Sequence, residues 1–385
     1  MNKIKSRILF LVQLPPPVHG VCVINKTIVY SKLVNARFEV SIFRLGFSNT
    51  FNQMHSDQLR KAILTLFYIF RLILKIATFR PKFAYFTISP TGAAFFRDAI
   101  FAFIFKWLKI PIVYHLHGTG VSSRLKSRLV SKIYRTVFNG EFVFHLSPLL
   151  YDDIKEIVSY KNCRFIPNGV SLLAKKHSET DNVRPEDNSL VRILYFANLD
   201  PRKGVFDLVD AFCMLLLQGV RAELTIGGSY TTQLSESQLE IYLLKSRKLG
   251  GQINVLGPVY GQDKAKMYQE ADIFVYPSCH DAFPLVVLEA MSYGLPIVTT
   301  KEGAIPDMVE DGCNGLLVPH RDPESLSVAV AKLISDRELR KQFGEISYQR
   351  YKTKFTSDIF EKNFVDKLTE VSLLLEKDKA DECCS

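Results

Sequence analysis

The chain has 385 residues, more than one hydrophobic core usually organises, so its length predicts two domains. Apolar residues make up 47% of the chain and charged residues 23%, which excludes the disordered and low-complexity classes. The formal net charge of +10 favours an anionic partner: a phosphorylated small molecule, an acidic membrane surface or nucleic acid.

The N-terminal run RILFLVQL follows basic residues, as in a signal peptide, but no small-residue cleavage site comes after it. We interpret the run as a buried first strand that ends at the prolines. Seven cysteines are scattered without metal-binding spacing. We therefore expect a reducing, cytoplasmic compartment.

Short apolar runs alternate with helical patterns along the chain, which predicts parallel α/β domains. The first strand runs are RILFLVQL, FAYFTIS, IVYHLHG, FVFHLS and CRFIPNGV. The alternation restarts later with VRILYFANL, AELTIGG, INVLGPV, DIFVYPS, LPIVTT and GLLVP. We expect one domain over residues 1–170, a polar linker over 171–189, a second domain over 190–352, and a closing helix and tail over 353–385.

Residues 61–79 form the most apolar stretch, but charged residues interrupt it too often for a membrane span. Arg71, Lys75 and Thr78 recur at i, i+4 and i+7 and predict a polar stripe on an amphipathic helix. Two interpretations stay open: a helix packed on its sheet, and a basic helix that lies on an anionic membrane and is released by salt. The apolar run 93–110, with the only tryptophan, Trp107, slightly favours the second.

The segment HDAFPLVVLEAMSYGLP holds two carboxylates eight positions apart. Pro284 favours a helix start and Gly294 a helix end, which predicts a helix over 284–293. The unpaired amides at the start of this helix would form an anion site suited to phosphate. The residues that would contribute those amides are Leu285, Val286 and Val287.

Asp281 and Glu289 would then flank a phosphate site, where carboxylates repel the phosphate but bind hydroxyl groups well. A nucleoside diphosphate sugar, with a diphosphate between two polyhydroxyl units, fits this arrangement. The alternative is that Asp281 only caps the helix and Glu289 is an exposed acid favoured by the helix dipole.

The longer segment over residues 277–319 resembles the signature of retaining glycosyltransferases of family 4. That family has the GT-B fold, in which two Rossmann-like domains with parallel sheets face each other across a cleft and a C-terminal helix returns toward the first domain. The family pattern of two glutamates separated by seven residues is matched here by Asp281 and Glu289, with a shorter acid at the first position.

Other segments also resemble the family's motifs. The stretch ANLDPRKGV resembles its phosphate-binding loop, which implies that Lys203 binds the diphosphate and places Asn198 where the family more often has Arg. In the first domain, Gly20 follows the first strand in a loop that faces the donor phosphates or the acceptor, and His117 resembles a histidine near the reacting sugar. Pro258 lies in a segment that resembles the loop over the nucleotide base.

The resemblance implies a hexosyltransferase-type enzyme that moves a sugar, with retention, from a UDP- or GDP-linked donor to a saccharide acceptor. We expect Asp281, His117 and Lys203 near the reaction, and no metal or other cofactor, since the chain has no Asp-x-Asp motif. The basic apolar helices of the first domain favour a lipid-linked acceptor at the inner face of a bacterial membrane, as in O-antigen, capsule or exopolysaccharide synthesis. No nucleic-acid partner is implied, and a soluble acceptor stays open.

Two alternatives remain at this point: a nucleotide-sugar 2-epimerase of the same fold, and a non-catalytic protein that binds nucleotide sugar. A dehydrogenase is disfavoured because no G-x-G-x-x-G follows any predicted strand.

Overall fold

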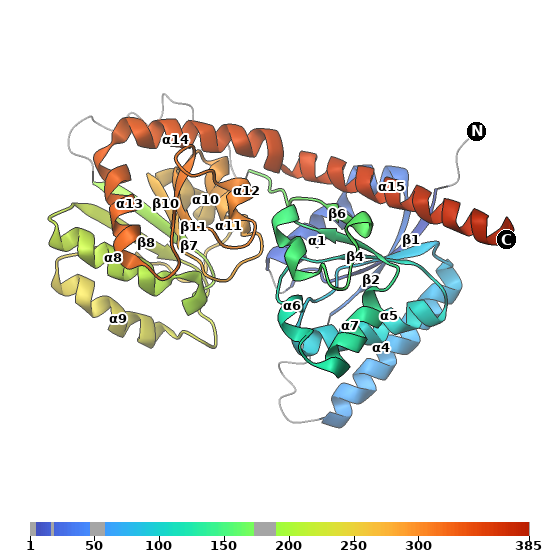
Figure 1. Ribbon diagram of the computed structural model, residues 1–385. Helices are drawn as coiled ribbons and strands as arrows, with labels where there is room; N and C mark the ends of the chain where they lie inside the picture. The colour runs from blue at the N-terminus through green and yellow to red at the C-terminus, as the bar shows by residue number, and fades with distance from the viewer. Residues whose placement is uncertain (1–4, 17–18, 47–57, 173–189, 385) are drawn as a thin grey trace. The chain divides into compact units, whose positions relative to one another are not determined.

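The structure is a computed structural model that describes residues 5–16, 19–46, 58–172 and 190–384 (Figure 1). These residues form two compact units. Unit 1 contains the chain up to Asn168 together with Ser357 onward, and unit 2 contains Gly169–Thr356. From residue 173 onward, the expected linker lies outside the described residues.

Unit 1 contains a six-stranded parallel sheet in the order β2-β1-β3-β4-β5-β6. All four residues of β3 and of β4 are buried, as expected for strands covered by helices on both faces. The strands are β1 (Arg7–Val12), β2 (Glu39–Arg44), β3 (Phe83–Phe86), β4 (Ile112–His115), β5 (Phe142–His145) and β6 (Cys163–Phe165).

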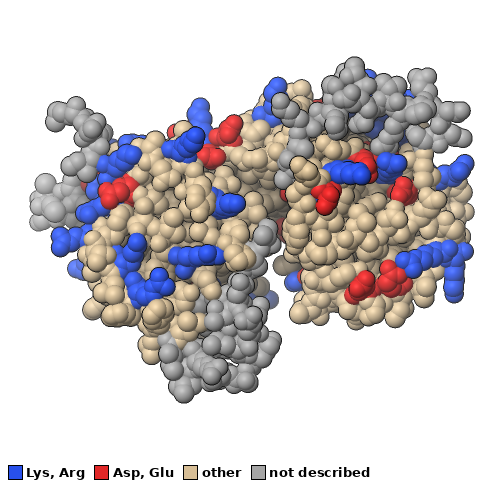
Figure 2. Space-filling view, turned by 180° about the vertical axis from the view of Figure 1, so that it is seen from behind, with Lys and Arg blue, Asp and Glu red and all other residues tan. Residues whose placement is uncertain are grey.

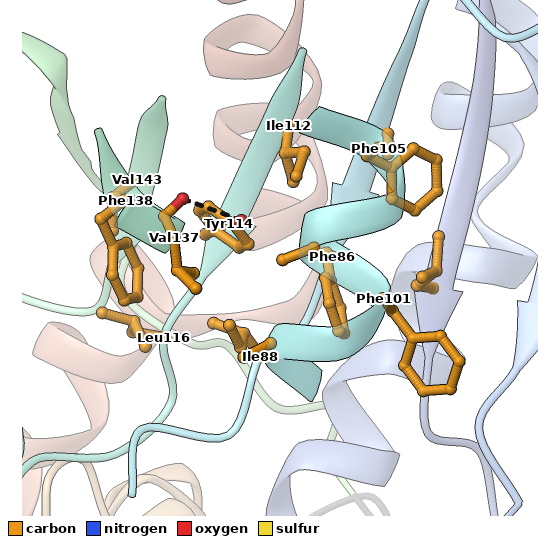
Figure 3. Close-up of a cluster of buried hydrophobic side chains, with 14 of the residues drawn as sticks. Phe86, Ile88, Phe101, Phe105, Ile112, Tyr114, Leu116, Val137, Phe138 and Val143 are labelled. Carbon is orange, nitrogen blue, oxygen red and sulfur yellow. Dashed lines mark hydrogen bonds between the residues drawn. The ribbon is translucent and has the colours of Figure 1, made fainter. Parts of the chain in front are cut away.

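Helices cover both faces of this sheet. One face packs against α4 (Gln58–Phe79), α5 (Gly92–Trp107) and α7 (Arg128–Phe138) in one apolar core. Figure 3 shows part of that core, where Phe101 and Phe105 of α5 lie near Phe86 of β3 and the Tyr114 hydroxyl donates to the Val137 carbonyl at 3.1 Å. The short α6 (Val121–Arg124) precedes α7.

The opposite face packs against the C-terminal helix. Phe364 of α15 (Ser357–Cys384) contacts Tyr85 of β3, with ring centroids 5.2 Å apart. α1 (Gly20–Tyr30) and α2 (Lys32–Arg37) adjoin α15. The predicted closing helix is therefore present and returns to the unit that contains the N-terminal strands, because its apolar stripe completes that core.

Unit 2 contains a second six-stranded parallel sheet in the order β12-β11-β10-β7-β8-β9. Its strands are β7 (Val191–Phe196), β8 (Ala222–Gly227), β9 (Gln252–Val255), β10 (Ile273–Tyr276), β11 (Ile297–Thr300) and β12 (Gly315–Val318). Its helices are α8 (Val205–Leu217), α9 (Glu236–Lys248), α10 (Gly261–Glu270), α11 (Leu285–Ser292), α12 (Ile305–Met308), α13 (Pro323–Ser335) and α14 (Arg337–Arg350). Two parallel sheets thus confirm the predicted α/β class.

The described part of the chain contains no helix long and apolar enough to cross a membrane. It also contains no group of His, Cys, Asp and Glu side chains arranged to hold a metal ion. Metal independence itself stays a prediction.

Candidate active site

The order of strands in unit 2 reverses between β7 and β10, which are hydrogen-bonded neighbours. Loops that leave such neighbours at their carboxyl ends separate and open a crevice, where ligands of open α/β sheets commonly bind. The loop after β7 carries Lys203, and the loop after β10 carries Asp281. The fold therefore brings together two residues that lie 78 positions apart in the sequence.

Asp281 forms an ion pair with Lys203 in which Nζ and Oδ2 are 2.6 Å apart. The Tyr276 hydroxyl donates to the same oxygen at 2.6 Å, while Oδ1 has no partner among the described residues. No side chain caps α11, whose cap position is held by Pro284. The interpretation of Asp281 as a helix cap is therefore wrong, and its free oxygen can accept a bond from a ligand.

Lys203 is held at the site by two acceptors, Asp281 and the carbonyl of His280, the latter at 2.7 Å from Nζ. An ammonium group carries three protons, so one donor is left for a ligand. Lys203 ends a short 3-10 turn, Pro201–Lys203, and is followed by Gly204 at a φ of 79°. A Cβ on Gly204 would lie 2.1 Å from the Pro277 carbonyl oxygen, so only glycine lets this loop approach β10 so closely.

A second glycine lies against the loop after β10, which carries Asp281. Gly303, at a φ of 55°, follows β11, and a Cβ there would lie 2.1 Å from the Asp281 carbonyl oxygen. The close approach of these two backbone segments explains why glycine stands at this position.

The first turn of α11 differs in one detail from the prediction. The amides of Leu285 and Val286 have no acceptor among the described residues, as expected for a helix start. The Val287 amide instead donates to the Pro284 carbonyl at 3.2 Å, so Val287 does not offer a free donor. The predicted anion site is therefore correct for two amides and wrong for the third, because a 3-10 hydrogen bond tightens the turn.

Glu289 is a half-buried acid whose carboxylate is held by a lysine and a tyrosine of α10. Lys264 Nζ lies 2.7 Å from both Oε1 and Oε2, and the Tyr268 hydroxyl donates to Oε2 at 2.9 Å. The side chains of Glu289 and Lys264 are only 14% and 17% exposed, so the interpretation of Glu289 as an exposed acid is wrong. Lys264 also lies over the ring of Phe196, 4.6 Å from its centroid.

Lys264, Tyr268 and Tyr276 were not identified from the sequence. Lys264 and Tyr268 are four residues apart on α10, which places them on one face of that helix, and this spacing is the only sequence signal that could have linked them. Burial raises the pKa of both Tyr268 and Tyr276. The neighbouring carboxylates, Glu289 beside Tyr268 and Asp281 beside Tyr276, raise these pKa values further. Both tyrosines therefore stay protonated and act as donors.

The remaining predicted residues of unit 2 lie on exposed loops. Asn198 follows β7 and its carbonyl accepts a bond from the Asp200 amide at 2.8 Å. Asp200 binds the nearby Arg202, with 2.7 Å between Oδ2 and a terminal guanidinium nitrogen. Pro258 follows β9 and is exposed. These positions leave the roles of Asn198 and Pro258 as predictions.

In unit 1, Gly20 is the first residue of α1, and His117 lies in the loop after β4. The His117 ring lies 4.0 Å from that of His115, whose Nδ1 is 2.6 Å from the Tyr85 hydroxyl. Burial lowers the pKa of His117 to about 3 and that of His145, on β5, to about 4.

These imidazoles are therefore neutral near neutral pH. The Nε2 atoms of His115, His117 and His145 are buried and without a hydrogen-bond partner among the described residues. His117 thus belongs to a larger histidine cluster that the sequence did not reveal, and its role near a reacting sugar stays a prediction.

The chain is similar to known glycosyltransferases. Residues 177–350 match the family model for glycosyl transferases group 1. The capsular polysaccharide biosynthesis glycosyltransferase CapM of Staphylococcus aureus is 27% identical over 43% of this chain and 42% of its own length.

Two further relatives match the chain over similar lengths. The O-antigen chain mannosyltransferase B of Escherichia coli is 30% identical over 38% of each chain. A D-inositol 3-phosphate glycosyltransferase of Corynebacterium jeikeium is 33% identical over 39% of this chain and 37% of its own length. The chain thus spans less than half the length of these curated relatives.

Solved structures resemble the chain over nearly its whole length. Sucrose-phosphate synthase from Thermosynechococcus elongatus matches with a TM-score of 0.72 and 17% identity, over 96% of this chain and 100% of that one. HepE of Anabaena in complex with UDP-glucose matches with a TM-score of 0.72 and 20% identity, over 94% of this chain and 99% of the HepE chain. The chain therefore has the GT-B fold, and its residues 177–350 match the model of the glycosyl transferases group 1 family.

Proposed function

We propose that this chain is a retaining, hexosyltransferase-type glycosyltransferase of family 4 that uses a nucleoside diphosphate sugar. The observation that carries the proposal is the pair of acid–lysine contacts in unit 2: Asp281 with Lys203 at the β7–β10 reversal, and Glu289 with Lys264 on the helix that begins just after Asp281. Both acids are held in place, and both are only partly used by protein donors.

The donor diphosphate is assigned to the start of α11. The amides of Leu285 and Val286 and the remaining proton of Lys203 can bind its oxygens. Glu289 accepts a bond from the ribose, and the free Oδ1 of Asp281 accepts one from the sugar. In the reaction, the bond between the anomeric carbon and the diphosphate oxygen breaks, the acceptor oxygen bonds to that carbon, and the acceptor proton passes to the departing diphosphate oxygen. Lys203 and the helix start stabilise the negative charge on the departing diphosphate.

The nucleotide part of the donor is assigned to UDP or GDP. HepE, which shares the fold, was solved with UDP-glucose, and this favours UDP as the first nucleotide to test. A screen of UDP-, GDP- and ADP-sugars that measures release of the nucleoside diphosphate tests the donor directly. No release with any donor, together with no thermal stabilisation by any of them, would contradict the proposal.

The acceptor is assigned to a lipid-linked saccharide of surface-polysaccharide synthesis, at the inner face of the membrane. Relatives that act in capsule and O-antigen synthesis support this assignment. The relative that acts on D-inositol 3-phosphate supports a soluble acceptor instead. Transfer of a labelled sugar into the organic phase of a membrane extract would support the lipid acceptor, and label only in the aqueous phase would contradict it.

The same screen separates the alternatives. A 2-epimerase would change the configuration of the free sugar at its second carbon without needing an acceptor. A non-catalytic binder would be stabilised by the nucleotide sugar but would release no nucleoside diphosphate.

A further inference from the structure

The outer face of α5 is apolar, although a helix that only covers a sheet normally turns polar residues outward. Its inner face lies in the core, as Phe101 and Phe105 show in Figure 3. Its outward residues recur at i, i+4, i+7 and i+11 and are large and exposed. They are Phe96, Ile100, Phe103 and Trp107.

The outer face of α4 continues this apolar surface. Leu72 and Ile76 of α4 are buried in the core, and five large apolar side chains point the other way. These are Leu66, Phe67, Phe70, Ile73 and Leu74. α4 and α5 lie side by side, because Tyr68 of one and Phe101 of the other both pack on Phe43, at 6.1 and 6.4 Å between ring centroids. The predicted polar stripe therefore does not dominate the exposed side of α4.

The segment that contains α5, α7 and most of α4 is strongly basic. Residues 64–140 contain 12 Lys and Arg but a single acid, Asp98, whereas the rest of the chain has 37 Lys and Arg and 38 Asp and Glu. Asp98 is buried and forms an ion pair with Arg97 at 2.7 Å. In Figure 2, the described residues in the lower part of the left-hand body, which is unit 1, include Lys and Arg but no visible Asp or Glu.

The basic residues gather on the neighbouring helix, α7, which contacts α5. Arg128, Lys132 and Arg135 recur at i, i+4 and i+7 and line an open groove. The one acid in this groove, Glu156, lies 3.6 Å from Arg135. Because α4, α5 and α7 cover the same face of the sheet, their outer sides form one surface with an apolar part and a basic part.

We propose that this surface, made by the outer sides of α4, α5 and α7, binds an anionic lipid bilayer. Aromatic and aliphatic side chains enter the boundary between headgroups and acyl chains, and the basic groove binds lipid phosphates. A second copy of the chain is a poorer occupant, because it would bring the same positive charge against this face. The proposal deepens the membrane location in the proposed function, but binding to lipid does not depend on sugar transfer.

The chain carries its own reporter for this proposal. Trp107 is the only tryptophan and is 79% exposed at the end of α5. We expect its fluorescence to shift to the blue when vesicles of phosphatidylcholine with phosphatidylglycerol are added, and to be quenched by lipids brominated in the acyl chains. Vesicles of phosphatidylcholine alone should bind at least tenfold more weakly. High salt should weaken the binding without abolishing it, because the apolar contacts are not screened.

Two pairs of variants test the two parts of the surface. Ile100→Gln with Phe103→Gln should weaken vesicle binding about tenfold or more. Arg128→Gln with Lys132→Gln should weaken it about twenty-five-fold, from roughly fivefold for each charge near an anionic surface.

The controls are matched pairs on unit 2. Leu217→Gln with Ile241→Gln removes two side chains that are each 70% exposed, and Lys245→Gln with Lys266→Gln removes two exposed charges. Neither control should change binding.

Three results would overturn the proposal: no binding to anionic vesicles, binding without a shift of Trp107 fluorescence, or a dimer in solution that Phe103→Gln converts to a monomer. None of these bears on donor turnover, which is measured without vesicles. The proposed function can therefore fail while this inference stands, and this inference can fail while the proposed function stands.

Discussion

Neutralising Asp281 should separate binding of the nucleoside diphosphate from transfer of the sugar. Asp281 Oδ2 takes one of the three protons of Lys203, at 2.6 Å. A diphosphate must therefore compete with this carboxylate for Lys203 and is also repelled by it. Asp281→Asn removes both effects, so UDP should bind at least as tightly as to the unchanged protein.

The size of the effect follows from the exposure of the pair. A hydrogen bond to a charged group contributes about 1.5–3 kcal/mol when it is buried. The two side chains are 21% and 20% exposed, which places the pair toward the lower end of that range through solvent screening. We therefore expect UDP to bind Asp281→Asn with unchanged affinity or up to about tenfold more tightly, a gain of about 1.4 kcal/mol. Transfer should slow about ten- to a hundredfold, because the sugar loses its charged acceptor.

The assay is calorimetric titration of UDP beside transfer kinetics, in a double-mutant cycle with Lys203→Met. Lys203→Met alone should weaken UDP binding about ten- to a hundredfold. The double variant should bind UDP no more weakly than Lys203→Met, since without Lys203 the Asp281 carboxylate can only repel the diphosphate. An equal loss of UDP binding in Asp281→Asn and Lys203→Met would refute this reasoning.

Three further predictions address other parts of the molecule. Lys264→Met should weaken binding of UMP and of UDP by the same factor, about tenfold, because its partner Glu289 faces the ribose that both nucleotides share. Calorimetric titrations that show a larger loss of affinity for UDP than for UMP would contradict this. In urea titrations, Gly303→Ala should lower the free energy of unfolding by about 1–3 kcal/mol more than Gly312→Ala. Both glycines have a positive φ, but only Gly303 lies against another backbone segment, and equal losses of stability would exclude that close backbone contact. Lowered pKa values keep His117 and His145 neutral in the folded state, so their contribution to stability is complete above the usual value of 6.5 and is lost as the pH falls from there toward 4. The unfolding temperature of unit 1 should therefore fall from pH about 7 to about 5, and a constant value would contradict the burial of these imidazoles.

The pattern of apolar residues, and the alternation of strand and helix patterns along the chain, were enough to predict the two sheets. Runs such as RILFLVQL and VRILYFANL are apolar at nearly every position, which is typical of strands covered on both faces, and helical patterns between them require parallel crossovers. The start of α11 could also be predicted locally, because Pro284 marks it in the sequence.

The contacts inside the site could not be predicted in the same way. Lys264 meets Glu289 across 25 residues and Lys203 meets Asp281 across 78, and both contacts depend on which strands become neighbours. Likewise, Thr78 and its basic neighbours suggested a polar stripe on α4, because periodicity does not reveal which side of a helix its sheet covers.

The central claim is that unit 2 holds a nucleoside diphosphate sugar between Lys203 and Glu289. A crystal structure of the protein with UDP, or with a donor analogue that cannot be hydrolysed, tests it most directly. The account predicts diphosphate oxygens within hydrogen-bond distance of Lys203 Nζ and of the Leu285 and Val286 amides, with a ribose hydroxyl on Glu289. A nucleotide bound elsewhere, with the Lys203–Asp281 and Lys264–Glu289 contacts unchanged and facing solvent, would contradict it.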